Sequence, residues 1–93
     1  MQERDKKKLE ENKKLILKAL SETIKELRGN KSQFMLSSES DIPISILSTA
    51  ERGIKDPQLT TIFRIAEAFD LSITEFLEKV CKKLPKNFEI IDK

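Results

Sequence analysis

Signals that end one helix and start the next follow each other closely along this chain, so every helix after the first must be short. Between these signals, apolar residues recur every three or four positions, which is typical of helices with one face in a core. No internal repeat and no Pro/Ser-rich linker marks a domain boundary. A chain of 93 residues suffices for one domain with a modest core. The sequence therefore predicts an all-α bundle of five helices.

The first helix is predicted from four inward-facing apolar residues: Ile16, Leu20, Ile24 and Leu27. It can begin as early as Arg4, but its first turns are almost entirely charged. We therefore expect an extended N-terminal helix in which residues 1–14 either protrude or fray. The main helical domain would follow over residues 15–83, and a short C-terminal tail over residues 84–93. Gly29 or Asn30 suits the left-handed conformation that ends helices.

Turn and cap residues define the second and third helices. Ser32 is a good N-cap for a helix over residues 33–40, and Asp41 tolerates the positive φ of a tight turn. Pro43 has no amide hydrogen to lose, which favours a third helix over residues 43–52 that Gly53 closes. The hydroxyl of Ser37, if buried, can bond the carbonyl four residues back.

The last two helices are predicted over residues 59–69 and 73–84. Ser72 and Glu75 have the spacing of a capping box for the fifth helix, and Pro85 should end it. In the tail, alternation suggests a strand and spacing suggests a helix, and so short a piece leaves both open. The fourth helix has a predicted inward stripe of Leu59, Ile62, Phe63, Ala66 and Phe69.

Several classes of site lack the residues they need. The chain has no His, and its single Cys81 leaves a disulfide, zinc or haem site without a ligand set. Gly29 and Gly53 are the only glycines, so a Gly-rich phosphate loop is excluded. We expect no enzyme, catalytic residue, metal or cofactor. Without a long apolar run or a signal peptide, the prediction is a cytoplasmic protein that does not bind a membrane.

Charge is unevenly distributed although the formal net charge is only +2. Residues 1–31 carry ten basic and six acidic side chains, a net of +4. Residues 32–80 carry four against eight, a net of −4, and residues 81–93 carry four against two, a net of +2. The basic charge therefore lies at the two ends of the chain.

Four motifs in order give the chain a family resemblance. They are "SQ" at residues 32–33, "ERG" at 51–53, "DP" at 56–57 and "IAEAFDLSITEFL" at 65–77. Together they resemble the lambda-repressor-like helix-turn-helix domain of Xre and Cro-type transcriptional regulators, over roughly residues 24–77. The resemblance implies DNA binding by the third helix. It also implies a structural ion pair between Arg28 and Glu51, and a DNA contact by Gln33 at the start of the second helix.

The third helix departs from the family because its expected outer face is not basic. No Arg is placed for the bidentate contact to guanine, whereas hydroxyls can bond base edges and Ile44 can contact a thymine methyl group. Such a face favours an A·T-rich operator, and the alternative is a solvated face that touches nothing. The matching positions are Pro43, Ile44, Ser45, Ser48 and Thr49.

Affinity for DNA would then depend on phosphate contacts. Lys31 precedes the second helix and Lys55 follows the third, so both are candidate anchors. The lysines of the first helix either reach a flanking phosphate or belong to a solvated helix that is paired with Glu3, Glu10 and Glu11. These lysines are Lys6, Lys7, Lys8, Lys13 and Lys14.

Two functional hypotheses follow. The first is a cofactor-free regulator that binds double-stranded DNA as a homodimer, through its fifth helix or its tail, unless the tail folds back or is disordered. The second is a helix-turn-helix scaffold for a protein partner, of an antitoxin-like or antirepressor-like kind. Phe34 and Met35 bear on the choice, since they either pack on the first helix or join Ile44 in an exposed apolar patch.

Overall fold

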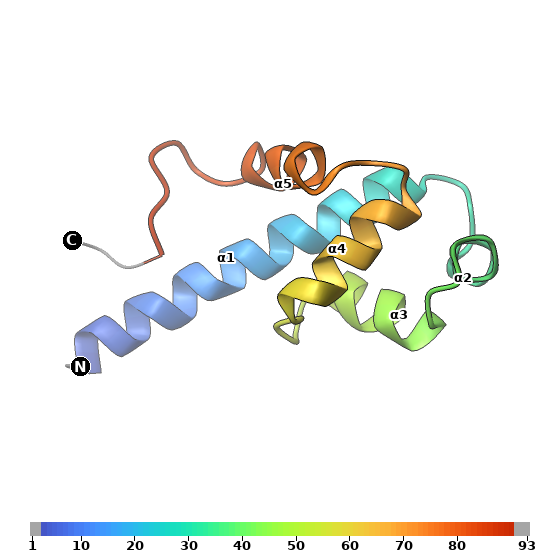
Figure 1. Cartoon of the computed structure of the whole chain (residues 1–93). Coiled ribbons are helices and arrows are strands. Elements are labelled where there is room, and N and C mark those ends of the chain that lie inside the picture. The colour runs from blue at the N-terminus through green and yellow to red at the C-terminus, as the bar shows by residue number, and fades with distance from the viewer. Residues whose placement is uncertain (1–2, 91–93) are drawn as a thin grey trace.

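Five helices make up the computed structural model, which describes the backbone of residues 3–90 and the side chains of residues 6–90. The elements are α1 (Glu3–Arg28), α2 (Gln33–Ser40), α3 (Ile44–Arg52), α4 (Leu59–Ala68) and α5 (Ile73–Cys81). Figure 1 shows α1 as the long axis, with α5 along one side and α3 and α4 on the other. The described residues contain no strand, which confirms the all-α prediction. Nor does any described helix have the length and hydropathy of a membrane span.

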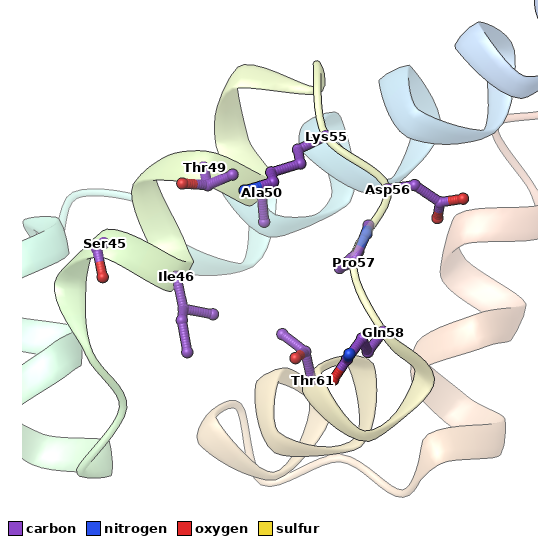
Figure 2. A pocket seen from close by; sticks show the side chains of 9 residues that line it. All are labelled: Ser45, Ile46, Thr49, Ala50, Lys55, Asp56, Pro57, Gln58 and Thr61. Atoms are coloured by element: carbon purple, nitrogen blue, oxygen red, sulfur yellow. The ribbon is translucent and has the colours of Figure 1, made fainter.

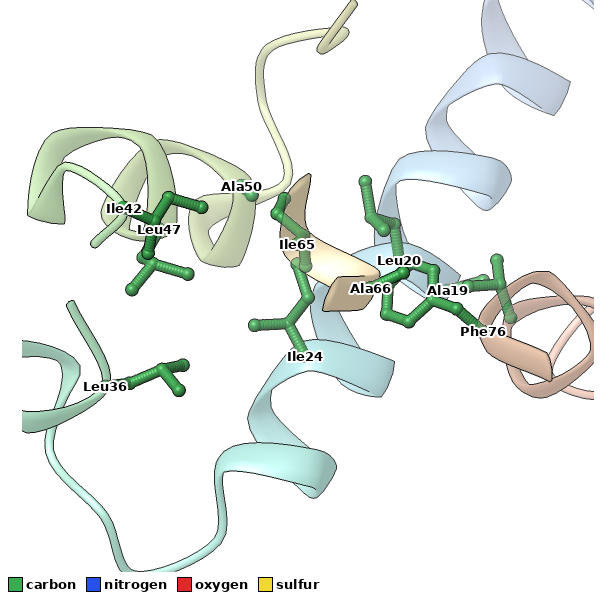
Figure 3. Close-up of a cluster of buried hydrophobic side chains, with 11 residues drawn as sticks. Ala19, Leu20, Ile24, Leu36, Ile42, Leu47, Ala50, Ile65, Ala66 and Phe76 are labelled. Carbon is green, nitrogen blue, oxygen red and sulfur yellow. The ribbon is translucent and has the colours of Figure 1, made fainter. Parts of the chain in front are cut away.

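The core lies where α1 is enclosed by α3, α4 and α5 (Figure 3). Ile24, Leu47, Ile65 and Phe76 are fully buried, one from each of these helices. Leu20 and Ile24 lie in the core and Leu27 packs against it, as predicted. Ala19 is also buried because α5 covers a second face of α1.

The predicted inward stripe of α4 is partly wrong. Ala66 is buried and Ile62 and Phe69 pack against the core, but Leu59 and Phe63 are 66% and 44% exposed. Ile65, which lies outside the predicted stripe, is fully buried instead. Apolar residues surround more than half of this helix, so spacing alone does not decide which side faces the core.

Helix α5 begins as predicted and ends early. The Ser72 hydroxyl accepts from the Glu75 N–H, and the Glu75 carboxylate accepts from the Ser72 N–H. The hydrogen bond from the Ser72 N–H lowers the pKa of Glu75, since it stabilises the ionised carboxylate. The predicted end near Pro85 is wrong: the helix stops at Cys81, and Leu84 bonds only three residues back. The residue before a proline avoids the helical region, which favours this earlier end.

The tail folds back onto the N-terminal extension, one of the outcomes that the sequence left open. The Asn12 side-chain amide donates to the carbonyls of Glu89 and Ile90, at 3.1 and 2.9 Å. Asn12 is thereby buried, at 7% exposure. Residues 84–90 form neither strand nor helix, and Ile91 lies outside the described residues. The predicted division after residue 14 falls within the continuous helix α1.

Candidate nucleic-acid interface

The turn between α2 and α3 sets the angle at which α3 is presented. The Ser32 hydroxyl caps α2 by accepting from the Met35 N–H at 3.0 Å, and Asp41 takes a φ of 54° at the end of the helix, as expected. Ser37 is half-buried, and its hydroxyl donates forward to the carbonyl of Ile42 rather than to the carbonyl four residues back. Because Ser37 also accepts the Ile42 N–H at its own carbonyl, it closes the turn in both directions.

Arg28 joins α1, α2 and α3. Its Nε and Nη2 donate to the two carboxylate oxygens of Glu51, at 2.9 and 2.7 Å, so the expected ion pair is present. Its Nη1 donates to the carbonyl of Lys31, just before α2. Glu51 is 4% exposed, and the hydrogen bond from Arg28 to this carboxylate raises the pKa of the guanidinium. Such a bidentate pair constrains orientation as well as distance.

Close contact between α1 and the end of α3 completes this support. The Ser21 hydroxyl donates to the carbonyl of Glu51 at 2.5 Å. Gly53 ends α3 with a φ of +66°, and a Cβ there would lie 3.4 Å from the Leu17 carbonyl oxygen. The positive φ favours glycine at this position, and the end of α3 lies within van der Waals distance of α1. The base of α3 is therefore held against α1, while its opposite side faces outward.

The outward side of α3 carries the residues that the sequence assigns to DNA contact. Pro43, Ile44 and Ser45 are exposed, and Ser48 and Thr49 are half-buried. Arg52 is exposed on the same side, where its Nη2 lies 3.5 Å from the Thr49 hydroxyl. We define the α3 outer face as Ile44, Ser45, Ser48, Thr49 and Arg52. It is polar over most of its length, with a single cation at its C-terminal end.

An open groove of about 570 Å³ runs along one side of the α3 outer face. Figure 2 shows Ser45 and Thr49 on its α3 side, the loop with Lys55 at one end, and Gln58 and Thr61 on its α4 side. Gln58 makes no side-chain cap, so no described side chain caps the amide groups at the start of α4. These amides and Lys55 are two sources of positive potential in the groove, and Asp56, which also lines it, is a source of negative potential.

Lys31 does not lie in this groove. Its Nζ is 2.5 Å from a carboxylate oxygen of Glu39, and it lines a separate polar cleft together with Arg64 and Glu67. Gln33, the first residue of α2, is half-buried. The predicted contact residues thus form two groups, one on α3 with the following loop and one at the start of α2.

Phe34 and Met35 are exposed, at 70% and 50%, so they do not pack on α1. Ile44 is 44% exposed at the start of α3. The apolar side chains on this part of the molecule are therefore open to contact.

Sequence reasoning missed three polar residues beside the predicted ones: Arg52, Gln58 and Thr61. Arg52 was detectable, since positions 45, 48, 49 and 52 lie on one side of a helix. Gln58 and Thr61 follow the "DP" motif, but which way they face depends on how α4 packs. Among the side chains of residues 6–90, no three potential metal ligands lie together.

Comparison with known proteins agrees with this geometry. The model of a helix-turn-helix family matches residues 24–76, more than half of the chain and the part that holds the α2–α3 turn and the α3 outer face. No curated protein and no solved structure matches the chain. The chain therefore belongs to the Xre and lambda-repressor-like helix-turn-helix family, a family of DNA-binding regulators.

Proposed function

We propose that this protein is a transcriptional regulator that binds double-stranded DNA in a sequence-specific manner, with α3 in the major groove. The observation that carries the proposal is the α3 outer face, which projects polar side chains from a helix whose other side is fixed by Arg28 and Gly53. A recognition helix needs both properties, because base edges are read at hydrogen-bond distance.

Hydroxyl groups and one aliphatic side chain on α3 would recognise the bases. Ser45, Ser48 and Thr49 donate or accept hydrogen bonds at base edges, and Ile44 contacts thymine methyl groups. Since most of the face offers no guanidinium for guanine, an A·T-rich operator remains the favoured target. Arg52 adds one cation at the far end of the face, suited to a phosphate or a guanine at the margin of the site.

Phosphate contacts would supply most of the affinity. Lys55 and the uncapped start of α4 suit the backbone on one side of the major groove. Gln33 and Lys31, at the start of α2, suit the backbone on the other side. These two sets of phosphate-binding groups flank α3, so they would orient the helix as well as attract the DNA.

A titration of fluorescent A·T-rich and mixed-sequence duplexes at 50 and 200 mM salt tests the proposal. We expect affinity to fall steeply with salt, with a logarithmic slope of about 0.9 per phosphate contact, and to differ between the sequences. Equal affinity for both duplexes would mean that the protein binds DNA but does not distinguish these sequences. Absence of binding at the lower salt concentration would refute the proposal.

Glu39 is expected to weaken DNA binding by holding Lys31. In the variant Glu39→Gln the lysine has no anionic partner at that position, so it should contact a phosphate more fully. The exposed pair itself contributes little to stability, about 0–1 kcal/mol, and the fold should be unaffected. We expect the salt slope measured in the same titration to rise, by less than the value of about 0.9 that one additional phosphate contact would give. The variant Glu78→Gln, which removes the same charge on α5, serves as the control.

A homodimer is part of the proposal, because one small recognition helix gives limited specificity. Its support is the exposed pair Leu59 and Phe63, which lie one turn apart on α4. This surface replaces the tail as the favoured interface, because the backbone of residues 89 and 90 already bonds Asn12. A two-fold axis at α4 would place two α3 helices on related sides of the dimer.

Replacing both Leu59 and Phe63 with serine is expected to convert the dimer to a monomer of 10.7 kDa in sedimentation equilibrium at micromolar concentration. The change removes two apolar side chains that self-association would bury. Leu77→Ser on α5, where Leu77 is 41% exposed, is the control and should leave the dimer intact. Dissociation by Leu77→Ser alone would place the interface on α5. A wild-type protein that sediments only as a monomer would contradict the dimer.

Exposed Phe34 and Met35 favour a second candidate function, the binding of an apolar protein partner. In that case the helix-turn-helix fold serves as a scaffold, and DNA affinity is weak or absent. Truncating Phe34 to alanine distinguishes the two functions: it should abolish binding to such a partner and leave the salt-dependent DNA titration unchanged.

A further inference from the structure

The N-terminal part of α1 is a strongly basic helix that runs beyond the core. Residues 6–14, defined here as the basic arm, hold five lysines against two glutamates, a net charge of +3. Lys6, Lys7, Lys8 and Lys14 are exposed. In Figure 1 this part of α1 extends past the helices that form the core. Lysines this close together on one helix either stay solvated or bind an anionic partner.

One side of the basic arm adjoins the groove beside α3. Lys13 Nζ lies 3.9 Å from a carboxylate oxygen of Asp56, which follows Lys55 in the loop and lines the same groove. Further along α1, the backbone of Leu17 lies close to Gly53. The arm therefore leaves the core directly beside the place where Lys55 is proposed to contact phosphate.

The other side of the basic arm is covered by the tail. The buried Asn12 amide bonds two consecutive tail carbonyls, and Lys8 lies in the same tail-lined pocket as Asn12. The arm continues α1 as one helix, and its contacts to Asp56 and to the tail lie on two different sides of it. Lys6 and Lys13 are seven residues apart, so they differ by only about 20° around the helix and share the side near the groove.

We propose that the basic arm is a second DNA-binding surface, which contacts backbone phosphates beyond the base pairs that α3 reads. The inference rests on the proposed function and extends it to the flanking DNA. Lys6 lies about 10 Å further along the helix axis than Lys13. That distance equals the rise of about three phosphates along one strand.

Asp56 competes with DNA phosphates for Lys13. Both members of the Lys13 and Asp56 pair are largely exposed, with side-chain exposures of 42% and 64%, so the pair is weak. A phosphate at the same place competes for Lys13 with a comparable charge. The acidic partner holds the lysine side chain at the loop in the absence of DNA and releases it when a phosphate arrives.

The test compares two double variants of the full chain in a titration of a 30-base-pair mixed-sequence duplex across salt concentrations. Lys6→Gln with Lys13→Gln removes two charges from the arm, and Lys79→Gln with Lys82→Gln removes two exposed charges from the α5 end. We expect the arm variant to lower the salt slope by about 1.8 and the control to leave it unchanged. Far-UV circular dichroism verifies that both variants stay helical.

Each outcome is decisive. An equal loss of slope in both variants means attraction by overall net charge and overturns the arm proposal, and so does an unchanged slope in the arm variant. If the wild-type protein binds and only Lys55→Gln and Arg52→Gln weaken it, the proposed function stands and the arm proposal fails. If the wild-type protein does not bind the duplex at low salt, both fail together.

Discussion

Replacing Arg28 with methionine is expected to lower the free energy of unfolding by about 3–5 kcal/mol, the usual cost of breaking a buried ion pair from one side. Glu51 is 4% exposed, so its carboxylate would stay buried without a counter-charge. The variant also loses the hydrogen bond to the Lys31 carbonyl. In a domain of this size, the melting temperature should fall by about 12 °C or more. Differential scanning calorimetry measures it directly.

The double variant Arg28→Met with Glu51→Met distinguishes the contribution of the ion pair to stability from that of side-chain packing. It leaves no buried charge, so most of the lost stability should return. Recovery would mean that the ion pair orients α3 against α1 more than it stabilises the fold. A single variant that melts within a degree or two of the wild type would contradict the assignment, because Glu51 would then have found water or another partner.

Local chemistry explains which parts of the fold could be predicted from the sequence. Ser32, Asp41, Gly53 and Ser72 act within a few residues of their own positions, and each caps or closes a helix as expected. The Arg28 and Glu51 pair joins distant positions, and only the family resemblance made it predictable.

Long-range packing explains the errors. The orientation of α4 depends on the helices packed against it, chiefly α5 and α2, so Ile65 lies in the core in place of Leu59 and Phe63. The contact from Asn12 to the tail spans 77 residues, and an asparagine among charged residues gives no sign that it will be buried. No pattern within a single helix carries this information.

The candidate site was predictable to a similar degree. The positions of the α3 outer face follow from helical spacing, and they carry Ser45, Ser48 and Thr49 as expected. What the sequence could not reveal is which cations are available: Lys31 lies against Glu39 and Lys13 against Asp56, whereas Arg52 shares the outer face. Availability depends on neighbours that the turns and loops bring together.

Reversing the charge at both Lys31 and Lys55 is expected to reduce affinity for duplex DNA by about 100-fold or more. Each lysine is proposed to make a charge-assisted contact, worth about 1.5–3 kcal/mol, and 1.4 kcal/mol corresponds to a factor of ten. Glutamate at either position also repels the phosphates. The measurement is a fluorescence anisotropy titration at 100 mM salt, with a matched control in which Lys79 and Lys82 on the α5 side become glutamate.

The control separates local contact from overall charge. Both double variants change the net charge by the same amount, but the α5 side lies away from the α3 outer face, so its variant should bind within about threefold of the wild type. A similar loss in both would mean that DNA is attracted only by the net charge of the protein. If neither variant changes binding to a partner that is captured through Phe34, the apolar surface forms a separate site, because phosphate anchors contribute nothing to such a contact.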